Sequence, residues 1–331
     1  MNSPILIGIG AGLVSAVLFA STLTGSVLSI MLFYVTALPG FLAGLGWGTQ
    51  AAIVSIFVGA GLTGAIIAPL AGLGYFLTLG LPIAVLCYLA LLGRPAAENA
   101  VIEYGETSPP GGGKIEWYPP GHIIAWATLM AGGIAAMSIP IFGTDIETYR
   151  TNLQDVLDKT FFSQLPDGAP PGMSKEDMAP VVELLIRALP AALAIVWLSV
   201  MLLNMWTAGK IVTVSGRAIR PWPDFTMVNY PTHFALGFVA SLVGTFAPGI
   251  LSVIATGFAG AFLMAYVLLG LIVLHVMARN SPFKFIALGT VYLGIFIFGW
   301  VALVVAIVGI GEPMFRFRAR SLGIKPPRKD E

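Results

Sequence analysis

An all-α, polytopic bundle of transmembrane helices is the fold class that this sequence predicts, and three observations point to it. The first 93 residues contain no Asp, Glu, Lys, Arg or His, and Arg94 is the first charged side chain. Over the whole chain, 57% of residues are hydrophobic and 10% are charged, whereas an ordinary soluble domain has about 25% charged residues. The third observation is that many apolar runs approach the roughly 20 residues that cross a bilayer.

The uncharged part, residues 1–93, divides into four helices at its polar and proline-containing positions. Pro39 interrupts the second helix and Pro82 lies inside the fourth. The first helix has no basic flank and further spans follow it directly, so it is expected to be a retained helix and not a signal peptide. The short connections predict antiparallel neighbours. The four helices are expected at residues 4–20, 26–47, 50–67 and 72–92.

The rest of the chain alternates polar stretches with five further apolar segments. Residues 94–121 are rich in Pro and Gly and predict a loop. Residues 144–178 form an extramembrane acidic segment, residues 181–311 the C-terminal helices and residues 312–331 a basic tail, all within one integral membrane domain over residues 1–331. The five apolar segments are expected at residues 122–142, 181–206, 233–246, 250–277 and 285–310.

Charge asymmetry indicates the orientation of the chain. Lys and Arg concentrate in the tail and in residues 207–231, while residues 144–178 hold seven acidic against three basic side chains. Because cytoplasmic loops carry the excess of Lys and Arg, both basic regions are expected in the cytoplasm and the acidic segment outside. Nine full crossings would separate the two basic regions. We therefore expect eight crossings among nine hydrophobic segments, with both termini cytoplasmic and the short segment 233–246 re-entrant.

Within the acidic segment, apolar residues spaced by three or four predict one external amphipathic helix over residues 145–165. Helices that lie on anionic lipid are normally basic. This acidic helix is therefore expected to cover the outer mouth of the bundle or to dock a protein partner. Its apolar positions are Ile146, Tyr149, Leu153, Leu157, Phe161 and Leu165.

Small residues recur at intervals of four, a spacing that lets helix backbones approach closely in lipid. Residues 59–64 also match G-x-G-x-x-G, but the match lies in an apolar segment with no acidic residue near it, so helix packing explains it better than nucleotide binding. The predicted packing positions are Gly40, Gly44 and Gly48 in the second segment and Ser252, Thr256 and Gly260 in the eighth.

The sixth segment carries the most suggestive polar pattern. Glu183, Trp197 and Asn204 are spaced by multiples of seven and share one helical face. Arg187 lies one turn from Glu183 and can pair with it. Together these four residues are the candidate wall of a cavity for a polar solute. The alternative is that the ion pair lies at the membrane interface while Asn204 bonds a neighbouring helix.

The remaining candidates for chemistry are few. His275, near the end of the eighth segment, could relay a proton, but Arg279 one turn away favours an interfacial ring bonded to a carbonyl. Cys87 is the only cysteine and is expected to be a small buried hydrophobe. The chain has three His and no recognisable catalytic motif, so we predict no enzyme activity, no metal site and no cofactor. A net charge of +1 gives no reason to expect a nucleic-acid partner.

Two stretches carry a resemblance to a known family: Leu38 to Gly44 followed by Gly48, and Gly270 to His275 continuing through Val308–Glu312 to Phe315–Arg320. On these residues the chain resembles the YybS-like family of uncharacterised bacterial multi-pass membrane proteins. That family is distantly similar to the substrate-binding subunits of energy-coupling-factor transporters and to the rod-shape protein MreD. The resemblance implies a compact helical bundle with either a small-molecule pocket or a scaffolding role.

Two functions remain open at this stage. The first is a transporter-like subunit in the bacterial inner membrane that binds an unknown small solute between its helices. The alternative is a non-transporting scaffold or assembly factor for an envelope complex, which contacts a protein partner through the acidic segment and the basic tail. A polar cavity would favour the first function, and a filled bundle would favour the second.

Overall fold

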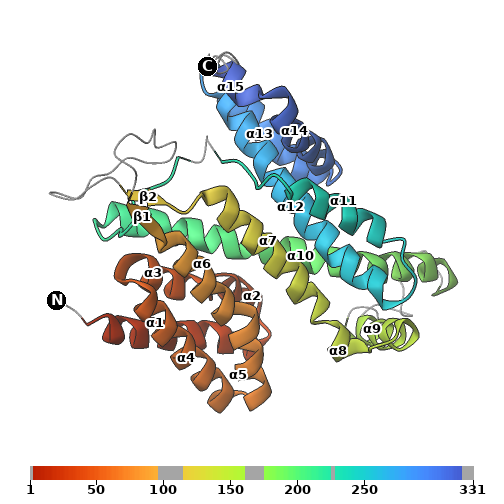
Figure 1. The fold of residues 1–331 in the computed structure, drawn as a ribbon. Coiled ribbons are helices and arrows are strands. Elements are labelled where there is room, and N and C mark those ends of the chain that lie inside the picture. Colours follow the sequence, from red (N-terminus) through yellow and green to blue (C-terminus); the bar gives the residue numbers. More distant parts are fainter. Residues whose placement is uncertain (1–2, 96–114, 161–174, 225–227, 323–331) are drawn as a thin grey trace. The chain divides into compact units, whose positions relative to one another are not determined.

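A computed structural model describes residues 3–95, 115–160, 175–224 and 228–322 (Figure 1). The described part is helical apart from two short strands, and seven of its helical segments are long and apolar enough to cross a membrane. This confirms the predicted all-α class. Parts of the predicted loop, of the acidic segment and of the basic tail, at 96–114, 161–174 and 323–331, lie outside the described residues.

Two compact units make up the chain. Unit 1 contains residues 1–127 and 199–231, and unit 2 contains residues 128–198 and 232–331. Two helices contribute residues to both units, α7 (Pro120–Ala136) and α10 (Lys175–Val214).

Unit 1 begins with the uncharged helices. Their helical turns break close to where the prolines lie. A Pro lacks an N–H and clashes with the carbonyl four residues earlier, and the chain leaves the α-helix just before Leu38, so Pro39 occupies the first turn of a new helix. A π-helical segment likewise precedes Pro82. The elements are α1 (Pro4–Ala20), η1 (Ser21–Thr24), α2 (Val27–Tyr34), α3 (Leu38–Trp47), α4 (Thr49–Ile66), α5 (Pro69–Tyr75), η2 (Phe76–Gly80) and α6 (Leu81–Leu91).

Glycines set how closely these helices approach. A Cβ atom added to Gly8 would stand 2.6 Å from the Ala51 carbonyl oxygen, and one added to Gly12 would stand 2.5 Å from that of Ser55. The backbones of α1 and α4 therefore touch. In the G-x-G-x-x-G match, Gly59 faces the Tyr75 ring, while Gly61 has no neighbour within 4 Å. Residues 59–64 lie within α4, where Gly59 serves helix packing.

The two ends of the predicted loop at 94–121 pair with each other. Strands β1 (Gly93–Pro95) and β2 (Ile115–Trp117) are antiparallel, with Arg94 opposite Glu116. The Arg94 Nε atom donates to a Glu116 carboxylate oxygen at 2.8 Å, and both side chains are exposed. Sequence patterning over three-residue strands is too short to have shown this hairpin.

Unit 2 holds the amphipathic helix, which is α9 (Ile146–Thr160), preceded by the short α8 (Ile139–Phe142). Tyr149 and Leu153 of α9 are buried against Val182 and Ile186 of α10 and Val253 of α12 (Ile250–Ala278). The predicted amphipathic helix is thereby confirmed over its described part, and its apolar face packs against the starts of α10 and α12.

The seventh segment forms a short helix that runs antiparallel to the helix after it. The helices α10 and α12 run parallel, since Ile186 meets Val253 and Ala191 meets Gly260. Helix α11 (Phe234–Gly244) lies antiparallel to α12, because Phe234 packs on Phe262 and Tyr266 while Gly244 approaches Ala255. The segment thus leads back toward the end of unit 2 where α9 lies. Helix α11 has 11 residues and is about 16 Å long, shorter than the hydrocarbon core, so the re-entrant segment at 233–246 stays a prediction.

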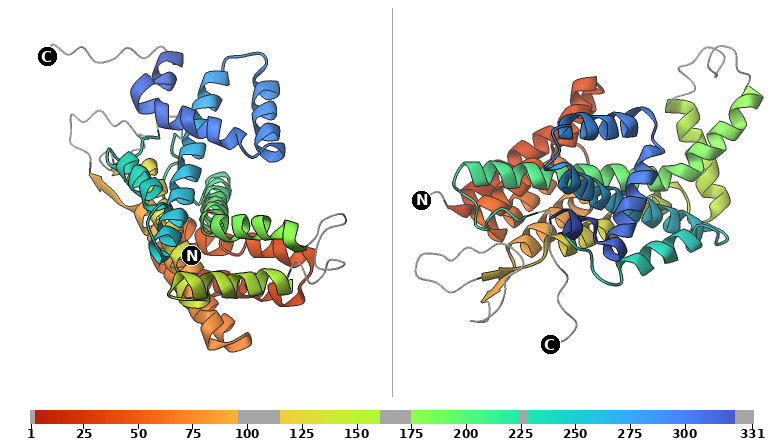
Figure 2. Two further views of the ribbon diagram at one scale, coloured as in Figure 1. Left: turned by 90° about the vertical axis from the view of Figure 1, so that its right-hand side faces the viewer. Right: turned by 90° about the horizontal axis from the view of Figure 1, so that it is seen from above.

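The ninth segment was expected as one span over residues 285–310, but it is divided into α13 (Lys284–Ile297) and α14 (Val301–Phe315). Phe298 leaves the helical conformation and Gly299 follows it in the turn. Each helix is about 22 Å long, short of the roughly 30 Å hydrocarbon core. Figures 1 and 2 show α15 (Phe317–Ser321) at the end of unit 2 where α12 ends and α13 begins.

Single-cysteine labelling tests this path. In a Cys87→Ala background, Asn280→Cys and Ser321→Cys should react with an impermeant maleimide from one side of the membrane and Asp155→Cys from the other. The reason is that α12 leads from the α9 end of unit 2 to the opposite end, to which the chain returns at α15. Labelling before and after permeabilisation of the cells gives the side. Reaction of Asn280→Cys from the same side as Asp155→Cys would favour the re-entrant path for α11.

Replacement of Gly44 tests the packing of unit 1. Gly44 faces Cys87 of α6, and a Cβ placed on it would stand 3.0 Å from the Ala52 Cβ of α4. Gly44→Leu should therefore destabilise the fold by about 1–3 kcal/mol and lower the thermal midpoint in detergent by several degrees. Gly61→Leu is the matched control, since nothing lies within 4 Å of Gly61. Equal midpoints for the two variants would contradict close packing at Gly44.

Candidate functional site

The predicted polar face of α10 begins with an ion pair at the surface of unit 2. The Arg187 Nε atom donates to a Glu183 carboxylate oxygen at 2.7 Å. Arg150 of α9 approaches the same oxygen at 3.6 Å. All three side chains are between 38% and 67% exposed, so screening by solvent leaves their pairing weak. The group joins α9 to α10 at the surface.

Asn204 makes a different kind of contact, in unit 1. Its buried side-chain amide donates to the Tyr34 carbonyl at 2.7 Å and to the Val200 carbonyl at 2.8 Å. Tyr34 is the last residue of α2, where helix carbonyls lack intrahelical partners. The Asn204 carbonyl oxygen is buried and has no hydrogen bond. Of the four predicted residues, the structure brings Glu183 and Arg187 together, while Trp197 lies partly buried elsewhere in unit 2 and Asn204 lies in unit 1.

The predicted packing positions differ in their surroundings. A Cβ on Gly40 would stand 3.2 Å from Ile83, and one on Gly260 would stand 2.6 Å from the Ala191 Cα. Gly48 has a φ of +95° and ends α3, a conformation that favours glycine. Ser252 and Thr256 are partly buried, and their hydroxyls donate to carbonyls of their own helix region.

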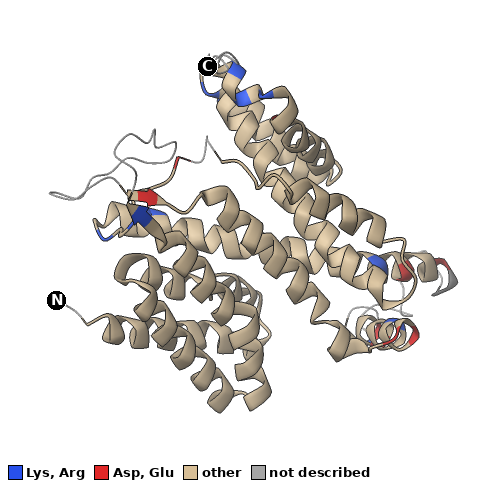
Figure 3. Ribbon diagram, viewed as in Figure 1, with Lys and Arg blue, Asp and Glu red and all other residues tan. Residues whose placement is uncertain are grey.

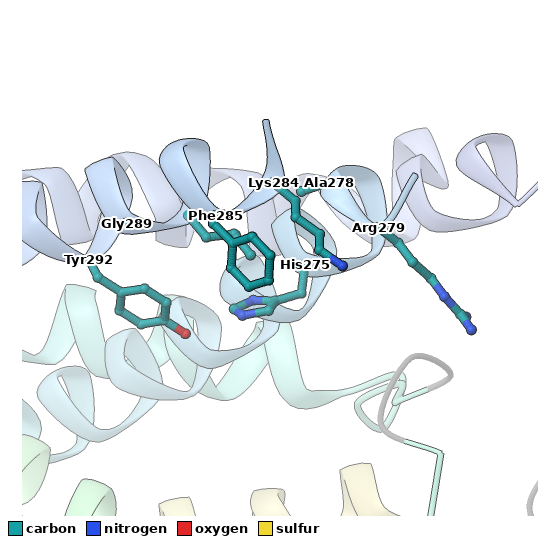
Figure 4. Close-up of a pocket in the computed structure, with 8 residues that line it drawn as sticks. His275, Ala278, Arg279, Lys284, Phe285, Gly289 and Tyr292 are labelled. Carbon is teal, nitrogen blue, oxygen red and sulfur yellow. The ribbon is translucent and has the colours of Figure 1, made fainter. Parts of the chain in front are cut away.

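A hollow of about 490 Å³ lies between the end of α12 and the start of α13, within unit 2 (Figure 4). Figure 4 shows the His275 and Phe285 rings next to each other with Tyr292 to their left, the Lys284 amine to their right, and Arg279 farther right, pointing away from them. The His275 and Tyr292 rings stand edge to face at 5.9 Å. The lining residues are His275, Ala278, Arg279, Lys284, Phe285, Leu288, Gly289 and Tyr292.

The hollow is positively charged and has no acidic residue among those that line it. Neither Arg279 nor Lys284 forms an ion pair with another residue of the described part. The His275 Nδ1 atom lies 2.8 Å from the Leu271 carbonyl, and because a carbonyl only accepts, Nδ1 carries the proton. The expected hydrogen bond of His275 to a carbonyl is therefore present, whereas its position at the membrane interface stays a prediction.

Sequence reasoning missed this hollow, although a signal for it existed. A His, an Arg and a Lys fall within ten residues at the end of an apolar segment. Positive side chains at the end of an apolar segment indicate where a membrane span ends, and by themselves they do not predict a binding site. The turn between Ala278 and Lys284 places the first turns of α13 beside the last turn of α12, so that this boundary becomes part of a lined hollow.

A second group of basic and aromatic residues lies at the end of α10 in unit 1. The Arg220 guanidinium donates to the Ala90 carbonyl at 3.1 Å and lies 5.9 Å from the Trp117 ring, and burial lowers its pKa to about 10. Lys210 stands 4.4 Å over the Trp222 ring. The Trp117 indole N–H is buried without a hydrogen bond. These contacts hold the polar stretch after α10 against α6 and β2.

A buried ion pair closes the C-terminal end of unit 2. Glu312 of α14 and Arg318 of α15 are 2.7 Å apart, with both side chains no more than 7% exposed. Arg316 between them adopts a left-handed conformation, with φ of 50°. Glu312 accepts both the side-chain and the backbone N–H of Arg318. Arg318 therefore joins α15 to α14, while the side chains of Arg316 and Arg320 are exposed.

Comparison with known proteins gives one assignment. Among the described residues, no group of three His, Cys, Asp or Glu side chains is placed to hold a metal ion. No curated protein and no solved structure matches the chain. The model of a family described as predicted membrane protein (DUF2232) matches residues 113–311, more than half of the chain. The chain, a multi-pass helical membrane protein by its spans and packing, therefore belongs to this DUF2232 family of predicted membrane proteins.

Proposed function

We propose that this protein is a transporter-like membrane subunit that binds a small anionic solute in the hollow between α12 and α13. The observation that carries the proposal is the set of side chains there: three basic residues, two aromatic rings and no acid. The volume of about 490 Å³ falls within the range of small-ligand sites.

Each side chain has a role in this proposal. The Lys284 ammonium and the Arg279 guanidinium attract an anion, and the guanidinium offers paired donors to a carboxylate or phosphate. His275 adds a donor when its Nε2 atom is protonated. The rings of Phe285 and Tyr292 cover the less polar part of the solute. Lys284 stands 5.0 Å from the centre of the Phe285 ring, which positions the ammonium over the aromatic wall.

The proposed location is the bacterial cytoplasmic membrane, with residues 207–231 and the tail in the cytoplasm. The excess of Lys and Arg in these two regions supports that side. Figure 3 shows Lys and Arg at the end of unit 2 that carries α15, and Asp and Glu together with some Lys and Arg at the end that carries α9. On this orientation the hollow opens toward the cytoplasm and α9 lies outside.

The second candidate function is a scaffold for an envelope complex. Its supporting observation is the acidic outer face of α9, which stays exposed after Tyr149 and Leu153 are buried. Native mass spectrometry of the purified protein separates the candidates, since a co-bound small molecule favours the first and a stoichiometric protein partner favours the second. The exposed acids of that face are Asp145, Glu147, Asp155 and Asp158.

Removal of the Lys284 charge tests the solute site. Glycerol 3-phosphate should bind the purified protein, and Lys284→Gln should weaken its binding by about fivefold, the effect of losing roughly 1 kcal/mol of charge attraction. Isothermal titration gives the dissociation constants. Arg320→Gln, which removes an exposed cation of α15, is the control and should bind as the unchanged protein does. Equal weakening by both variants, or no binding of glycerol 3-phosphate at all, would refute a site for a free anionic solute.

Asn204→Leu distinguishes the predicted α10 face from a packing contact. Loss of the hydrogen bonds to Tyr34 and Val200 should destabilise the fold by about 1–2 kcal/mol, while glycerol 3-phosphate binding by the folded protein stays unchanged. Thermal unfolding and titration measure the two effects. Thr207→Val is the control, since that hydroxyl bonds only a carbonyl of its own helix. Unchanged stability with lost binding would return Asn204 to the solute site.

A further inference from the structure

We infer that the hollow between α12 and α13 holds the phosphate headgroup of an anionic phospholipid whose acyl chains lie along α13. This inference rests on the proposed function and names the chemical class of the ligand. Three features of unit 2 support it: the place of the hollow on α12, its charge, and the uncovered apolar surface of α13.

The hollow lies where a span ends. Helix α12 is 29 residues long and apolar throughout, and the hollow is lined by its last turn and the first turns of α13. Arg279 follows the last helical residue of α12, and Lys284 is the first of α13. Cations at the end of a span stand at the depth of the lipid phosphates. The mouth of the hollow is therefore level with the headgroups.

The charge of the hollow is complementary to an anionic headgroup. Arg279 and Lys284 flank the short connection after α12, and neither is paired with an acid in the described part. Basic pockets between transmembrane helices are known to bind anionic headgroups. A net-neutral lipid such as phosphatidylcholine carries its own ammonium, which these cations repel.

The apolar part of the ligand is accounted for by α13. None of its residues is buried in the structure. Phe285 is 80% exposed, Ile286 69% and Phe296 88%, so the helix offers a continuous apolar surface below the cationic mouth. A free anion would leave this surface untouched. An acyl chain covers it while the phosphate stays at Lys284, so an amphiphile matches both parts of the site.

Native mass spectrometry with defined lipids tests the inference. The full-length protein is titrated with phosphatidylglycerol, with phosphatidylcholine of the same acyl chains, and with glycerol 3-phosphate. We expect phosphatidylglycerol to bind at least tenfold more tightly than either of the others. The double variant Arg279→Gln, Lys284→Gln should reduce that binding by about fivefold for each cation removed. The control Arg316→Gln, Arg320→Gln removes two exposed cations outside the hollow and should bind as the unchanged protein does.

The outcomes separate this inference from the proposed function. Phosphatidylglycerol bound no more tightly than glycerol 3-phosphate overturns the lipid assignment and leaves the solute site standing. Equal binding of phosphatidylglycerol and phosphatidylcholine, or equal loss in the two double variants, also overturns it, because the cations would then act only as surface charge. Failure of all three ligands to bind rejects both proposals. Thermal unfolding of each variant verifies that the protein under test is folded.

Discussion

Close contact between helix backbones is the constraint on which the rest of this structure depends. Hydrocarbon gives helices no hydrophobic drive to associate, so dispersion contacts between small residues must hold them. Gly8 and Gly12 bring α1 onto α4, and Gly270 lies against the Val305 carbonyl where α12 meets α14. Larger side chains at these positions would overlap with backbone atoms, which cannot move aside as a side chain can.

The same solvent accounts for the polar residues inside the spans. A polar group left unpaired in hydrocarbon costs several kcal/mol, so each needs a partner nearby. Ser15 donates to the Thr36 carbonyl at 2.6 Å and shares a second hydrogen bond with Tyr75. The side-chain amide of Asn204 donates a hydrogen bond to the carbonyl of Tyr34, the last residue of α2. Polar groups of this kind hold helices together, which leaves the ends of the spans as the place for charge and for binding.

The candidate site lies where the close packing of α12 against other helices ends. Helix α12 carries tightly packed glycines along most of its length, but Gly289 of α13, which lines the hollow, has no atom within 4 Å of a Cβ placed on it. No small-residue contact draws α13 onto the end of α12, so a space remains between them. Charged side chains gather at that end of the span, and a lined, cationic hollow is the result.

The sequence by itself determined the helical membrane class, the break near Pro39 and the amphipathic α9, because composition, proline chemistry and local periodicity specify each of them. It also identified Glu183 with Arg187 as a pair, since i,i+4 spacing is a property of one helix. Only the tertiary structure decided the path of α11, the division of the last segment at Phe298 and the hollow at His275. These depend on which helices meet, and contacts between distant segments leave no periodic signal in a chain that is apolar on every face.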